Sequence, residues 1–135
     1  MKERSILFVC HGNICRSVMA EYILKSMAPE IRCESRAVSH EDEGRDIYYS
    51  AKQCLDRHGI AYGRHRARVI SQKDYDSFDE IYVMDHENLN MIRWIINDRD
   101  QKVRMLTTQE IEDPWYTDRF DEVYEQIREG IEKIL

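Results

Sequence analysis

The residues of this chain best suited to covalent chemistry are Cys10 and, six positions later, Arg16, which Ser17 follows directly. A free cysteine has a pKa of about 8.5, and a helix N-terminus or a nearby cation lowers such a value to roughly 3.5–7.5. A guanidinium group can donate two parallel hydrogen bonds to two phosphoryl oxygens, and a serine hydroxyl can donate to the sulfur. This spacing therefore predicts nucleophilic phosphoryl transfer to Cys10.

The elements around this pair are expected to form an anion site. Residues 6–9 are a continuous apolar run, which is typical of a strand buried in a parallel sheet. Gly12 and Asn13 tolerate positive φ, so the backbone can curl there before a helix begins near Ser17. A loop that joins a strand to a helix N-terminus directs its N–H groups at an anion. The expected phosphate-binding residues are His11, Gly12, Asn13, Ile14, Cys15, Arg16 and Ser17.

A second candidate lies far along the chain, at Asp113, where the leaving oxygen of a phosphate ester could obtain its proton. Pro114 fixes its own φ and biases Asp113 away from helical geometry, so the carboxyl group is held on a stiffened loop. Trp115 and Tyr116 follow and can form an aromatic wall beside a planar substrate. Loops at the carboxyl ends of parallel strands gather at one edge of a sheet, so the separation in sequence is no obstacle.

Together these motifs resemble those of the low-molecular-weight protein tyrosine phosphatases, and the likeness covers nearly the whole chain. The matching segments are Val9-Cys10-x-Gly12-Asn13-Ile14-Cys15-Arg16-Ser17, Ser35-x-Ala37-Val38-Ser39, His58-Gly59-Ile60, His65-x-Ala67-Arg68, Phe78-Asp79-x-Ile81-x-Val83-Met84-Asp85 with Asn88, and Asp113-Pro114-aromatic-Tyr116. Cys-x5-Arg alone occurs in unrelated phosphatases. Its combination with the late acid and the flanking segments is specific.

The resemblance implies a role for each of the three main residues. Cys10 is expected to be the nucleophile that forms a phosphocysteine, and Arg16 to bind the transferring phosphoryl group. Asp113 is expected to protonate the phenolate and then to activate water as a general base. The reaction needs no metal and no cofactor.

The resemblance also implies supporting residues and partners. Asn13 is expected in a left-handed conformation, braced by Ser17, Ser35 and His65. The substrates are expected to be phosphotyrosine-containing proteins, and a tyrosine kinase is one candidate partner.

One segment departs from the family pattern. The loop over residues 40–46 forms a wall of the substrate cleft in the family and often carries an aromatic residue, whereas here it is acidic. We expect Glu41 and Asp42 to line this wall together with Trp115 and Tyr116. Like charges repel, so acidic residues that flank the phosphotyrosine should be poorly tolerated.

Length and composition suit one domain over residues 1–135, with 42% hydrophobic and 34% charged residues. The formal net charge is −6, from 20 basic and 26 acidic residues, which argues against nucleic-acid binding. The first apolar run is too short for a signal peptide or a membrane span, so a cytoplasmic location is expected. The four cysteines are expected to be reduced, and the chain to be a monomer or a weak homo-oligomer.

The periodicity of the remaining chain predicts an α/β fold. Strands are expected over residues 6–9, 31–39, 78–84 and 103–106, and helices over 18–27, 47–58, 88–96 and from 117 or 118 onward. This alternation favours a three-layer sandwich with a four-stranded parallel sheet and helices on both faces. The resemblance implies strand order 2-1-3-4. Cys33 and Cys54 are expected in the core and His58 at a helix terminus, while Trp94 suits core or surface.

Other functions remain open from the sequence. Cys10 and Cys15 could form a redox disulfide, with Cys15 protecting an oxidised Cys10. Their spacing is unusual for zinc, and no second Cys/His pair is evident at ligand distance. An arsenate reductase of this fold would need further cysteines downstream, and none follows Cys54. A phosphoarginine phosphatase typically carries threonine at the position of Ile14, and a non-catalytic phosphate-binding module would not need Asp113.

Overall fold

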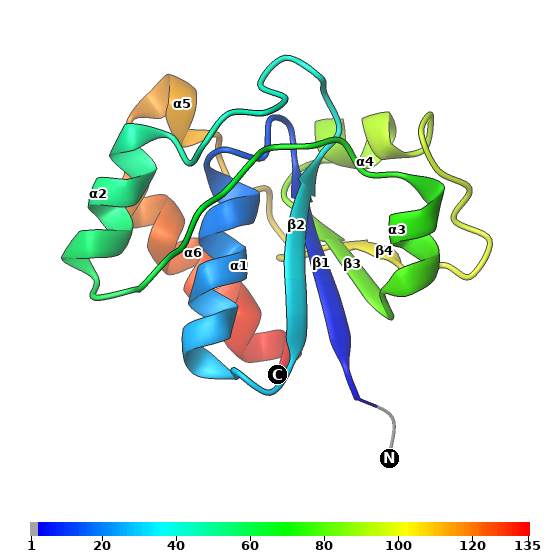
Figure 1. Ribbon diagram of the computed structural model, residues 1–135, viewed down its shortest axis with the longest axis horizontal. Coiled ribbons are helices and arrows are strands. Elements are labelled where there is room, and N and C mark those ends of the chain that lie inside the picture. The colour runs from blue at the N-terminus through cyan, green and yellow to red at the C-terminus, as the bar shows by residue number, and fades with distance from the viewer. Residues whose placement is uncertain (1–2) are drawn as a thin grey trace.

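A four-stranded parallel sheet with the order β2-β1-β3-β4 forms the middle layer of the protein (Figure 1). The computed structural model describes residues 3–135. The strands are β1 (Ser5–Cys10), β2 (Arg32–Ala37), β3 (Glu80–Val83) and β4 (Val103–Met105). Both the predicted fold class and the predicted strand order are confirmed. Because all four strands are parallel, their carboxyl ends meet at one edge, which is uppermost in Figure 1.

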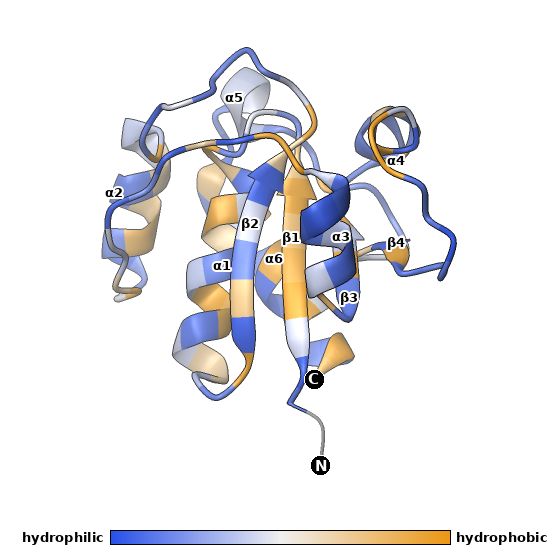
Figure 2. Cartoon of the chain, turned by 45° about the vertical axis from the view of Figure 1, so that its right-hand side comes forward, coloured by the Kyte–Doolittle hydropathy of each residue, from blue (hydrophilic) through white to orange (hydrophobic). Residues whose placement is uncertain are grey.

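Helices cover both faces of the sheet. On one side lie α1 (Arg16–Met27), α2 (Tyr49–Arg57), α5 (Pro114–Thr117) and α6 (Phe120–Ile134), and on the other lie α3 (Gln72–Ser77) and α4 (His86–Ile92). The apolar run of β1 serves both layers because side chains alternate along a strand. Ile6 and Phe8 pack into the core under α1 and α6, whereas Leu7 and Val9 pack into the core under α3 and α4. Figure 2 shows β1 as an apolar stripe through the centre of the sheet.

The closing helix α6 is amphipathic, as the spacing of its apolar residues predicts. Val123, Ile127 and Ile131 are fully buried and belong to the same core as Met19 and Ile23 of α1. Packing against α6 therefore fixes the position of α1 on the sheet. The N-terminus of α1, which follows the Cys10 loop, is therefore supported by the core.

Two short helices were missed in the sequence analysis. Helix α3 begins with a capping box, in which Ser71 Oγ accepts from the Asp74 N–H and the Asp74 carboxylate accepts from the Ser71 N–H. Asp74 also accepts from the buried Arg36, so this cap is tied to β2. The other, α5, begins directly after Asp113, in a segment expected to be loop.

The predicted boundaries of other elements need correction by a few residues. Helix α4 begins at His86 rather than at residue 88, because the Asp85 side chain accepts from the Asn88 N–H and caps it. It ends at Ile92 rather than at 96, and Trp94 beyond it is 90% exposed. The closing helix begins at Phe120, after Asp118 adopts the left-handed conformation that ends α5. Across residues 3–135, none of the helices combines the length and apolar character that a bilayer crossing requires.

Candidate active site

A cleft of about 140 Å³ lies at the carboxyl edge of the sheet, where β1 ends. It brings together the loop after β1, the acidic loop and the segment around Asp113. Its lining residues are Cys10, His11, Gly12, Ile14, Cys15, Arg16, Glu41, Asp42, Arg45, Asp113, Trp115 and Tyr116. The predicted nucleophile, arginine, acid and wall residues, separated by up to about a hundred positions in sequence, thus share one cleft.

The sulfur of Cys10 is the focus of three polar groups. The backbone N–H groups of Asn13 and Ser17 point at Sγ over N–S distances of 3.3 and 3.4 Å, and Ser17 Oγ lies 3.1 Å away. The Ser17 N–H belongs to the first turn of α1, so the positive end of the helix dipole also faces the sulfur. All three groups are hydrogen-bond donors that can face a negatively charged sulfur.

Asn13 holds the loop in its shape. Its φ is 62°, the left-handed conformation expected for it. Its side-chain amide donates to Ser17 Oγ at 2.8 Å and to Ser35 Oγ at 2.9 Å, and its carbonyl oxygen lies 2.6 Å from His65 Nε2. Since Ser17 Oγ accepts from Asn13, its own hydrogen is left for the sulfur of Cys10. The structure thus brings together all four residues that were expected to support the loop.

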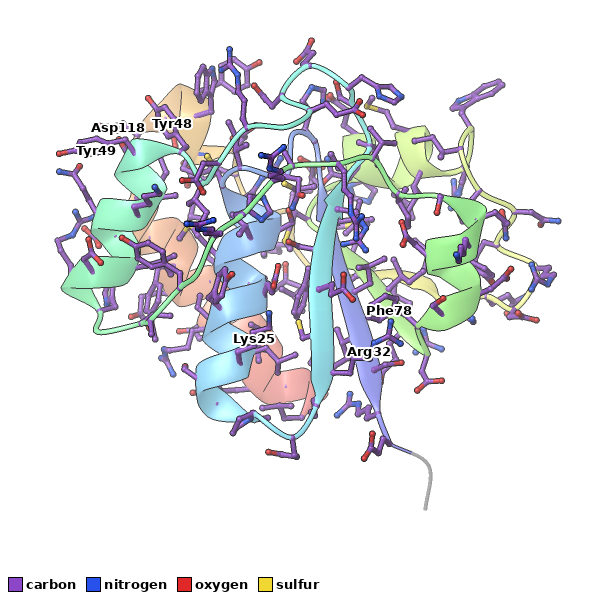
Figure 3. The ribbon with its side chains drawn as sticks, viewed as in Figure 1. Lys25, Arg32, Tyr48, Tyr49, Phe78 and Asp118 are labelled. Carbon is purple, nitrogen blue, oxygen red and sulfur yellow. The ribbon has the colours of Figure 1, made fainter. Side chains whose placement is uncertain are left out.

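The Ser35 hydroxyl extends this network to the protein surface. It donates to Glu21 at 2.6 Å, and Glu21 in turn accepts from Lys25 at 2.5 Å. Glu21 is buried, and Lys25 supplies its compensating charge. A chain of contacts therefore connects the loop after β1 to the outer face of α1, where Lys25 lies in Figure 3.

Arg16 is buried, with its guanidinium held by groups from two other loops. Nη1 donates to Asp85 at 2.7 Å and to the Ile111 carbonyl at 2.8 Å, while Nη2 lies 3.5 Å from Asp113. Burial alone would lower the pKa of Arg16, but negative charge on Cys10, Asp85 and Asp113 outweighs it and raises the pKa above its usual value. The group is therefore a fixed, fully charged donor in the cleft.

We expect Asp85→Asn to lower kcat/KM for an aryl phosphate by about 10- to 100-fold, the equivalent of a hydrogen bond to a charged group. The substituted amide still has an oxygen for the Asn88 N–H, but it no longer attracts Arg16. Steady-state kinetics together with circular dichroism measure the effect.

The control for this change is Asp76→Asn, which removes an exposed carboxylate 2.6 Å from Arg99 on the surface. It should leave kcat/KM unchanged. If Asp85→Asn is also silent, Arg16 does not depend on Asp85 for its position.

Asp113 occupies the N-cap of α5 with φ −85° and ψ 110°, the extended conformation that Pro114 favours. One carboxylate oxygen accepts from the Trp115 N–H at 3.0 Å, and the other faces Arg16. Its side chain is about one quarter exposed, so a substrate in the cleft can reach it. The expected rigidity of this segment therefore comes from a helix start as well as from the proline.

Aromatic rings form one side of the cleft. The ring centroids of Trp115 and Tyr48 are 4.6 Å apart, and Tyr48 also stacks on Phe120. In Figure 3 Tyr48 lies beside α5, at the start of α2. Tyr116 is 83% exposed at the outer rim. The Tyr48 ring thus packs against Trp115 and restricts its orientation, while the Tyr116 side chain is accessible to solvent.

Carboxylates also line the cleft. Glu41 lies 3.1 Å from His11 Nε2, and Asp42 lies 3.4 Å from Arg45. Asp42 leans over the loop so closely that a methyl group at Gly12 would come within 2.5 Å of its Oδ2. A side chain at position 12 would therefore require the Asp42 carboxylate to shift.

Sequence reasoning did not assign Asp85, Arg45 or Tyr48 to the site. For Asp85 a signal existed, because it follows a predicted strand whose carboxyl end had to lie at the active edge. Arg45 and Tyr48 lie in or just after the polar loop over residues 40–46. The path of such a loop cannot be predicted from the periodicity of the sequence.

The other cysteines differ from Cys10 in their surroundings. All four are free thiols. Burial raises the pKa of Cys15 and of Cys33 far above the usual range and raises that of Cys54 to about 12. These three are held protonated.

Comparison with known proteins agrees with this geometry. The sequence model of the family described as "Low molecular weight phosphotyrosine protein phosphatase" matches residues 5–135. A Bacillus subtilis protein named low molecular weight protein-tyrosine-phosphatase YfkJ is 34% identical over an alignment of 145 positions, which covers 97% of this chain and 93% of that protein. The human low molecular weight phosphotyrosine protein phosphatase is 34% identical, over 91% of this chain and 88% of its own.

Solved structures show the same fold. The crystal structure of YfkJ from Bacillus subtilis superposes with a TM-score of 0.92 at 32% identity, covering 99% of this chain and 93% of that one. SP-PTP, a low molecular weight protein tyrosine phosphatase from Streptococcus pyogenes, superposes with a TM-score of 0.89, also at 32% identity, over 98% and 91% of the two chains.

Proposed function

Because the chain belongs to the low-molecular-weight protein tyrosine phosphatase family, we propose that it hydrolyses phosphotyrosine in proteins through a phosphocysteine on Cys10. The observation that carries this mechanism is the convergence of two backbone N–H groups and the Ser17 hydroxyl on the Cys10 sulfur, in a cleft that also holds Arg16 and Asp113. Residues 1–135 act as one catalytic domain in this proposal.

In the first step the Cys10 thiolate attacks phosphorus, and the bond from phosphorus to the phenolic oxygen breaks. Arg16 donates to two of the nonbridging oxygens, where negative charge is concentrated. The proton for the departing oxygen comes from Asp113, whose neighbour Arg16 lies on the phosphoryl side of the cleft. Tyrosine leaves as a neutral phenol.

In the second step water attacks the phosphocysteine. Asp113, now ionised, accepts a proton from that water, and the phosphorus–sulfur bond breaks to release phosphate and the thiolate. Ser17 donates to the sulfur as charge returns to it. The cycle consumes one water, and every proton moves between groups that line the cleft.

The walls favour an aryl phosphate over phosphoarginine. Ile14 presents an apolar side chain to the cleft, and Trp115 supplies a flat ring braced by Tyr48. A tyrosine ring can pack against both groups. The guanidinium group of phosphoarginine would lose hydrogen bonds to water against the same apolar surface, which is unfavourable.

The experiment that tests this function compares peptides of one sequence that carry phosphotyrosine, phosphoserine or phosphoarginine, with release of inorganic phosphate as the readout. We expect turnover of phosphotyrosine to dominate. Acid quenching during turnover, followed by mass spectrometry, should find the phosphoryl group on the peptide that contains Cys10. Preferred turnover of phosphoarginine would overturn the substrate assignment but leave the phosphocysteine route intact.

The carboxylates of Glu41 and Asp42 in the cleft should affect which peptides the protein prefers. Replacing the exposed Glu41 by glutamine should raise kcat/KM about 3- to 10-fold for peptides with acidic residues beside the phosphotyrosine, because a like charge is removed. The gain should shrink at about 1 M salt, where the Debye length is about 3 Å. Glu129→Gln, on the exposed side of α6, is the matched control. Equal gains for basic and acidic peptides would contradict an electrostatic origin.

A further inference from the structure

Helices α2 and α6 pack against each other (Figure 1). Three side chains with metal-ligating atoms meet between them. Cys54 and His58 lie four positions apart on α2, so they share one side of the helix, and His58 is its C-cap residue. Asp121 lies in the first turn of α6. None of the three lines the active-site cleft. From the sequence, Cys54 is expected in the core and His58 at a helix terminus.

Two of the three distances between the ligand atoms are close to those of a tetrahedral zinc site. Zinc binds sulfur at about 2.3 Å and nitrogen or oxygen at about 2.0–2.1 Å, so the edges of its tetrahedron are about 3.5 Å from S to O and about 3.3 Å from N to O. Here Cys54 Sγ lies 3.7 Å and His58 Nε2 lies 3.0 Å from Asp121 Oδ1. All three atoms lie within 4.8 Å of one another. Small side-chain movements therefore suffice to receive an ion.

The donors around Asp121 Oδ1 indicate how an ion would be accommodated. This single oxygen is approached by the Cys54 thiol, by His58 and by two nitrogens of Arg57 at 3.3 and 3.1 Å. A divalent ion can replace the hydrogens that Cys54 and His58 direct at the oxygen. Arg57, half exposed, can remain on the carboxylate as an outer partner.

The residues around this cluster fix the His58 ring and leave the cluster open to solvent on one side. The imidazole of His58 stacks on the Tyr124 ring with a centroid distance of 3.7 Å, which fixes the ring orientation. Cys54 is fully buried, while the His58 and Asp121 side chains are 27% and 56% exposed. An ion can thus enter from solvent on the histidine and aspartate side, and a water can complete the coordination.

We propose that Cys54, His58 and Asp121 form a zinc-binding site that links α2 to α6. Binding releases the thiol proton of Cys54 and forms bonds from the ion to one sulfur, one imidazole nitrogen and one carboxylate oxygen. The thiolate and imidazole ligands favour zinc over magnesium or calcium. The site is separate from phosphoryl transfer, which needs no metal.

Cobalt(II) tests this proposal because, unlike zinc, it gives a sulfur-to-metal charge-transfer absorption and visible bands in tetrahedral sites. The titration uses the Cys10→Ser protein, which lacks the active-site thiolate. We expect charge-transfer absorption that saturates at one equivalent and disappears on addition of zinc. Adding Cys54→Ser should abolish it, and adding Asp121→Asn should weaken binding at least about tenfold.

Cys33→Ser in the same background is the control, since it removes another buried thiol and should change nothing. Circular dichroism checks each fold. If Cys54→Ser does not fold, Asp121→Asn, which alters an exposed side chain, decides alone. The proposal is overturned if no sulfur-to-cobalt band appears, or if both Cys54→Ser and Asp121→Asn leave the band and the affinity unchanged.

Discussion

Replacing Cys10 by serine should lower kcat for aryl phosphate hydrolysis by a factor on the order of 10⁴ or more, while phosphate binding stays within a few-fold of wild type. A serine hydroxyl is not ionised by the N–H groups of Asn13 and Ser17 at neutral pH, so no nucleophile remains. Arg16 and the loop amides, the expected phosphate-binding groups, are unchanged. Turnover measures the first effect, and protection by inorganic phosphate in a thermal melt measures the second.

The control is Cys33→Ser, a substitution of the same kind at a buried thiol in β2. It should cost some stability but leave kcat unchanged at a temperature where the protein is folded. Substantial turnover by the Cys10→Ser protein, after contamination is excluded, would remove Cys10 from the role of nucleophile.

Asp113→Asn should lower kcat by about 10²- to 10⁴-fold for phosphotyrosine or phenyl phosphate, the usual contribution of a general acid. The loss should be much smaller for p-nitrophenyl phosphate, whose leaving group is stable without a proton. Asparagine keeps an oxygen to cap the Trp115 N–H, so α5 should be retained. A leaving-group series of aryl phosphates gives the measurement, with a steeper dependence in the variant.

Asp118→Asn is the matched control. It removes the same charge from the other end of α5, and asparagine tolerates the left-handed conformation found there. An equal loss for every leaving group with Asp113→Asn would point to a positional role for the residue and not to proton transfer.

Much of this molecule could be predicted from its sequence because its strongest signals are local. The apolar run of β1, with Gly12 and Asn13 after it, defines a strand and a turn without tertiary information. Pro114 likewise predicts the extended backbone of Asp113. The strand order came from family resemblance, since neither periodicity nor composition defines which strands pair.

The missed features depend on contacts between distant segments. Helix α3 is short and polar, and it is stabilised by a capping box and by Arg36 of β2 more than by an apolar stripe. The pairing of Arg16 with Asp85 needs the ends of two strands to meet. The approach of Asp121 to α2 likewise appears only when the helices pack.

Asp113 connects the proposed proton transfer to the first turn of α5. Its carboxylate holds the first turn of α5 through the Trp115 N–H, and a charged acceptor forms a stronger hydrogen bond than a neutral one. In the proposed cycle Asp113 carries a proton in the first step and a negative charge in the second, so its hydrogen bond with the Trp115 N–H should strengthen between the two steps. The residue proposed to move the proton is thus also the residue that begins the helix carrying Trp115 and Tyr116.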